Sequence, residues 1–74
     1  MREKAIELAN RALQTPSLLN DLSEDVFFKF VMGISIYDIS LAMQVEQLKP
    51  FTNSNNKVLF WEAVGILVPL EDYR

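Results

Sequence analysis

The chain has 74 residues, half of them hydrophobic, and a formal net charge of −3 with no His and no Cys. This length limits it to a single small domain, residues 1–74. The negative charge argues against a general attraction to nucleic acid or to anionic membranes, which are themselves negative. Without Cys there is no disulfide framework and no thiolate chemistry.

The apolar content is high for so short a chain. A domain of this size buries only roughly 60% of the surface that its unfolded chain exposes, so some apolar side chains should remain outside. Large exposed apolar patches mark interfaces, whereas isolated exposed Leu and Val are ordinary. The N-terminus shows no secretory pattern, and the longest apolar run, residues 58–70, is shorter than the roughly 20 residues that span a bilayer. We therefore expect a cytoplasmic protein outside the membrane.

Residues 2–14 are predicted to form an amphipathic helix that ends before Pro16. Glu7 and Arg11 form a favourable pair four residues apart, and a proline disfavours helical backbone in the residue before it. We expect this helix to cover the core, with a weakly basic contact face as the alternative. Its apolar residues follow helical spacing: Ala5, Leu8, Ala9, Ala12 and Leu13.

A second helix is predicted after a short helical turn at residues 16–22, with Ser23 as its N-cap. Glu24 and Asp25 lie in its first turn, where the helix dipole favours acids. Residues 26–32 are apolar on nearly every face, which is typical of a central helix. Gly33 is predicted to terminate it. The core candidates are Phe27, Phe28, Phe30, Val31 and Met32.

The third helix is predicted over residues 36–48, with Ser35 as its cap and Pro50 beyond its end. Turn-forming residues follow at 52–56 and predict a mobile loop. A last helix is then expected to run to Val64 and to end at Gly65. Its cap is expected to be Ser54 or Asn55.

Residues 28–36 and 60–68 share a pattern of Phe, three residues, an apolar residue, Gly and Ile. The pattern predicts a helix–Gly–extended unit used twice, or a coincidence, because helices commonly end in Gly. Two copies are too few for a solenoid. Both alternatives stay open.

The sequence contains few of the residue types that commonly carry out catalysis. Without His the usual general base near neutral pH is missing, and adjacent carboxylates do not face each other on a helix. Ser54 and Lys57 match a Ser-x-x-Lys pattern, but the other motifs of that enzyme class are absent. Residues 21–25 resemble the beginning of a calcium-binding loop. The glycine at the sixth position of that loop is missing, and Met32 stands where the bidentate Glu should be. We expect no enzymatic activity, cofactor, metal or small-molecule substrate.

Two stretches resemble parts of DNA-binding regulators. Residues 35–45, SIYDISLAMQV, resemble the first helix and turn of a helix-turn-helix unit, and residues 59–69, LFWEAVGILVP, are similar to a stretch of MerR-type regulators. The resemblance implies a helix that reads a DNA groove. Gln44 stands where the turn glycine belongs, and Leu59 where an arginine precedes the aromatic pair. The candidate groove helix is apolar, whereas base and phosphate contacts need polar side chains.

The sequence therefore predicts an all-α domain, a compact bundle of four to five short helices, with a short extended segment at 66–68 as an open possibility. We expect a non-enzymatic regulator or adaptor that forms a homodimer or contacts another protein through its apolar C-terminal face. The alternative is a divergent helix-turn-helix, MerR-like DNA-binding transcriptional regulator. The predicted interface residues are Phe60, Trp61, Val64, Ile66, Leu67 and Leu70.

Overall fold

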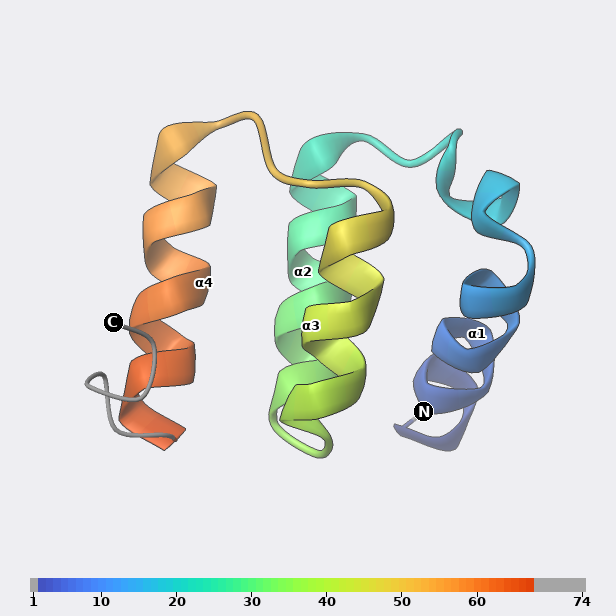
Figure 1. The fold of residues 1–74 in the computed structure, drawn as a ribbon, viewed down its shortest axis with the longest axis horizontal. Coiled ribbons are helices and arrows are strands. Elements are labelled where there is room, and N and C mark those ends of the chain that lie inside the picture. Colours follow the sequence, from blue (N-terminus) through green and yellow to red (C-terminus); the bar gives the residue numbers. More distant parts are fainter. Residues whose placement is uncertain (1, 68–74) are drawn as a thin grey trace.

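A computed structural model describes residues 2–67 of the chain, and side chains are described from residue 3 to residue 65. Successive helices run in opposite directions, with α2 and α3 in the centre, α1 on one side and α4 on the other (Figure 1). The described residues contain no strand, so the predicted all-α bundle is confirmed. The elements are α1 (Arg2–Gln14), a 3₁₀ helix η1 (Pro16–Leu19), α2 (Glu24–Ser35), α3 (Ile39–Leu48) and α4 (Ser54–Leu67).

Small side chains bring α1 close to the central pair. Ala9 and Ala12 are fully buried and Ala5 is half-buried, so one stripe of α1 presents only methyl groups to the bundle. Short side chains let two helix backbones approach closely, because interaxial distance depends on the side chains at the contact. The boundaries of this helix agree with the sequence prediction, and it covers the core as expected.

Helix α2 is the central helix, as predicted. Its N-cap is Ser23, whose Oγ accepts a hydrogen bond from the backbone N–H of Val26 at 3.3 Å. Phe27 and Val31 are fully buried. Phe30 is only half-buried and packs against the core from its edge. Phe28 and Met32 are also half-buried.

The predicted end of α2 at Gly33 is wrong. Gly33 lies inside the helix, which continues through the fully buried Ile34 to Ser35. Burial of the Ile34 side chain favours the extra helical residues, and Gly33 has no positive φ that would mark a helix end. Ser35 therefore does not cap α3. Asp38 does, accepting a hydrogen bond from the backbone N–H of Leu41 at 3.0 Å.

The predicted end of α4 is also wrong. This helix passes through Gly65 and runs to Leu67, so the extended segment considered for 66–68 is not formed at residues 66 and 67. Val68 lies outside the described residues. Because both Gly33 and Gly65 lie within helices, the helix–Gly–extended repeat is not present. A glycine inside a helix costs only about 1 kcal/mol, which tertiary packing can offset.

Phe51 is the aromatic centre of the core although it lies in the loop between α3 and α4. Only 6% of its surface is exposed. Its ring lies edge-on to three others, with centroids 5.5 Å from Phe27, 5.6 Å from Phe28 and 5.6 Å from Phe60. Each such pair contributes about 0.5–1.5 kcal/mol beyond the buried area. Phe51 thus joins α2 to α4, and the sequence analysis had not placed it in the core.

Candidate functional site

The motifs considered for catalysis and for metal binding lie at the starts of helices α4 and α2. No group of three or more acidic, His or Cys side chains between residues 3 and 65 could hold a metal ion. Ser23, part of the calcium-loop start, uses its Oγ as a helix cap. Ser54 and Lys57 are both exposed in the first turn of α4.

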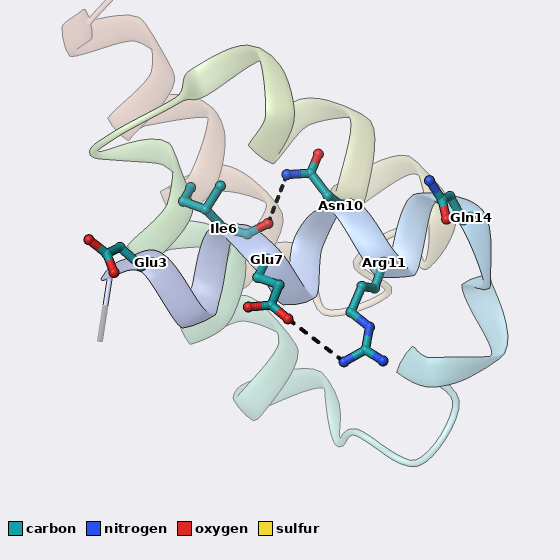
Figure 2. Close-up of a pocket in the computed structure, with 6 residues that line it drawn as sticks. All are labelled: Glu3, Ile6, Glu7, Asn10, Arg11 and Gln14. Carbon is teal, nitrogen blue, oxygen red and sulfur yellow. Dashed lines mark hydrogen bonds and ion pairs between the residues drawn. The ribbon is translucent and has the colours of Figure 1, made fainter.

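An open depression of about 500 Å³ runs along the outer side of α1 (Figure 2). All the described residues that line it belong to this one helix. The Asn10 side chain donates to the carbonyl oxygen of Ile6 at 3.1 Å, and Glu7 lies 4.0 Å from Arg11. Since one helix cannot enclose a ligand, the depression is not a candidate site. Its lining residues are Glu3, Ile6, Glu7, Asn10, Arg11 and Gln14.

The structure places the predicted interface residues in different environments. Phe60 and Val64 are fully buried in the chain's own core, so their assignment to an interface is corrected. They lie four residues apart on α4, on the side that packs against Phe51 and α2. Trp61 is half-buried, with its ring centroid 5.4 Å from that of Phe60. The side chains of Ile66 and Leu67, and all of Leu70, lie outside the described part of the chain.

The opposite side of α4 carries exposed apolar surface that the sequence analysis did not assign. Asn55, Val58, Leu59 and Glu62 are all exposed, and their spacing places them on one stripe of the helix. We call these four residues the outer stripe of α4. Val58 is 54% exposed and Leu59 51% exposed. Among these four residues the two central ones are aliphatic and the first and last are polar, and the helix continues beyond them to Leu67.

A network of hydrogen bonds fixes the start of α4 on the bundle. The Glu24 carboxylate, on α2, accepts from the backbone N–H of Asn53 at 2.8 and 3.0 Å, and from the backbone N–H and Oγ1 of Thr52 at 2.5 and 3.1 Å. These bonds, led by the Asn53 N–H, lower the pKa of Glu24. Asn53 in turn caps α4, since its Oδ1 accepts from the backbone N–H groups of Asn55 and Asn56 at 2.8 and 3.3 Å.

The other end of the loop is held by Lys49. Its Nζ donates to the carbonyl oxygens of Leu19, at 3.1 Å, and Leu22. These carbonyls lie at the end of η1 and just beyond it, and the Leu19 oxygen also accepts from the backbone N–H of Leu22 at 3.2 Å. Residues 49–53 are therefore tied to η1, to the core through Phe51 and to α2. The loop predicted at 52–56 is shorter than expected, because α4 already begins at Ser54. Its first two residues, Thr52 and Asn53, are held by Glu24.

The local geometry differs from the helix-turn-helix resemblance. Helix α3 is continuous from Ile39 to Leu48, so the turn that the resemblance implies at Gln44 is not formed. Of the aromatic pair in α4, Phe60 is buried. The outer stripe of α4 contains no Arg or Lys. It therefore offers no basic side chain to a phosphate, although Lys57 is exposed elsewhere in the first turn of this helix.

Other large apolar side chains are exposed at separate places on the described surface. Leu8, Leu18 and Val26 lie on α1, η1 and α2 respectively, and Ile36 and Tyr37 lie in the turn between α2 and α3. Scattered exposed apolar residues are normal.

No helix in the described range is long and apolar enough to cross a membrane. Comparison of the chain with protein-family models, with curated proteins and with solved structures finds no match.

Proposed function

We propose that this protein is a small non-enzymatic interaction module that contacts another protein surface through the outer stripe of α4. The observation that carries the proposal is the exposure of Val58 and Leu59 on a helix that also buries Phe60 and Val64 on its other side. A helix with apolar residues on opposite sides cannot cover all of them by packing against one neighbour. Here α4 lies at one edge of the bundle and packs mainly against α2 (Figure 1).

The energetics favour contact at this stripe. Each Å² of apolar surface removed from water contributes about 25 cal/mol, and the centres of interfaces are depleted in charged residues. Val58 and Leu59 supply an uncharged centre, while Asn55 and Glu62 supply hydrogen-bonding groups at its rim. The ties of residues 49–53 hold α4 in place before a partner arrives, which lowers the entropy lost on binding.

The non-enzymatic part of the proposal rests on the side chains that the chain contains. It has no His and no Cys, and the acidic groups nearest to its polar loop are already committed. Glu24 binds backbone N–H groups, and Asp25 accepts a hydrogen bond from the Asn56 side chain at 3.5 Å. A role as regulator or adaptor needs none of these groups for chemistry.

Site-specific photocrosslinking tests the proposal. A photoreactive amino acid replaces Leu59 in one variant and Gln44, an exposed residue of α3, in the control. Both variants are expressed in the native host and irradiated. We expect a discrete covalent adduct from position 59 and none from position 44. Equal labelling at the two positions, or no adduct at 59, would contradict a partner surface on α4.

A further inference from the structure

We propose that the partner is a second copy of this chain, with the two α4 helices packed antiparallel about a twofold axis between Val58 and Leu59. This inference rests on the proposed function and specifies its partner. The twofold axis follows from the order of residues along the outer stripe, which is polar, aliphatic, aliphatic, polar. A symmetric interface requires a patch that is complementary to itself.

The register of this pairing follows from the positions of the four residues. An axis between Val58 and Leu59 places each of these side chains opposite the other residue of the partner helix. Asn55 lies three residues before Val58, and Glu62 lies three residues after Leu59. The same axis therefore places Glu62 of each copy opposite Asn55 of the other. Both polar residues are exposed in the single chain and thus available for this pairing.

Charge favours the antiparallel arrangement over a parallel one. The side-chain amide of Asn55 can donate to a carboxylate. Asn55 also lies in the first turn of α4, which begins at Ser54, so Glu62 of each copy approaches the positive end of the partner's helix dipole. A parallel pair would place the two Glu62 carboxylates against each other. A twofold axis displaced by one helical turn toward Glu62 would also place the two Glu62 carboxylates opposite each other.

The size of the stripe sets the strength of the association. Four residues cover about two helical turns, which is less than the roughly 1,200 Å² buried in stable specific interfaces. The dimer is therefore transient, and its dissociation constant is expected to lie in roughly the micromolar to millimolar range. Two transient copies presented by a larger assembly would still pair, because tethering raises their effective concentration.

Sedimentation velocity over a concentration series gives the first measurement. The wild-type chain should shift from monomer toward dimer as concentration rises, and Leu59→Glu should weaken this association at least about tenfold. Leu18→Glu is the matched control, since Leu18 is 47% exposed and lies on η1. It should behave as the wild type does. Circular dichroism of both variants checks that they are folded. A wild-type chain that stays monomeric at millimolar concentration would overturn the inference.

Disulfide trapping tests the register, and the absence of native Cys makes the result unambiguous. Asn55→Cys and Glu62→Cys chains are mixed under mild oxidation. In an equimolar mixture the mixed disulfide should exceed either symmetric one by well over the roughly twofold excess that random pairing gives, because the antiparallel register joins position 55 to position 62. A mixed disulfide at or below that random excess would contradict this register. If the wild type is monomeric while the photocrosslink at position 59 captures a protein of different mass, the inference fails and the proposed function stands. If no crosslink forms either, both fail.

Discussion

Helices α1 and α4 lie at opposite sides of the same central pair, yet their outer faces differ in chemistry. The outer side of α1 carries mainly charged and amide side chains (Figure 2). Its inner side carries a stripe of buried Ala. Helix α4 buries Phe60 and Val64 and still exposes Val58 and Leu59. An edge position therefore does not by itself expose apolar surface. In α4 that exposure arises because the apolar sequence exceeds what one side of a helix can bury.

The largest expected effect separates the two sides of α4. Phe60→Ala should destabilise the fold by about 3–5 kcal/mol, because the removed ring is fully buried and lies against Phe51. Leu59→Ala, on the outer stripe, should cost less than about 1 kcal/mol in the monomer. Urea unfolding at low protein concentration measures both. Similar losses of unfolding free energy in the two variants would show that Leu59 belongs to the core. The outer side of α4 would then not differ from that of α1 in the way described.

The next effect tests the close approach of α1. Ala9→Leu should destabilise the fold by about 1–3 kcal/mol, because a larger side chain does not fit where Ala9 is fully buried. Asn10→Leu places the same side chain on the exposed side of this helix and should be nearly neutral. Thermal unfolding measures both variants. A neutral Ala9→Leu would mean that α1 is not closely packed on the bundle.

The stabilisation that the Glu24 hydrogen bonds provide between α2 and the start of α4 should depend on pH. The bonds from Asn53 and Thr52 lower the pKa of Glu24 in the folded state. Stability from this group is therefore present above its unfolded pKa and is lost as the pH falls through its folded pKa. Urea midpoints between neutral and acidic pH should fall less for Glu24→Gln than for the wild type. Glu3→Gln, an exposed carboxylate of α1, controls for the loss of charge. Parallel curves for Glu24→Gln and the wild type would refute this stabilising role.

The smallest expected effect is on nucleic acid. The outer stripe of α4 has no basic residue, and the chain carries a net charge of −3, so we expect no sequence-specific duplex binding at physiological salt. Fluorescence anisotropy with labelled duplexes at several salt concentrations measures this. Submicromolar binding to one defined duplex, weakened by salt, would instead support the DNA-binding alternative and would assign α4 a different partner.

Sequence reasoning located every helix of the described chain but misplaced several ends. The Ser23 cap and both ends of α1 were predictable, because a serine before acids and a proline after a periodic segment act locally. Gly33 and Gly65 were interpreted as helix ends, and neither is one. A glycine permits a helix to end without requiring it. Burial of Ile34, a tertiary contact, decides that α2 continues.

The sequence by itself determined that this chain is helical and that it contains more apolar residues than a small core needs, since both follow from composition and local periodicity. Only the tertiary structure decided which of those residues are covered. In α4 the residues from Val58 to Trp61 are all apolar, so periodicity cannot distinguish an inner side from an outer one. Phe51 and the hydrogen bonds of Glu24 orient the helix. That orientation buries Phe60 and leaves Leu59 exposed.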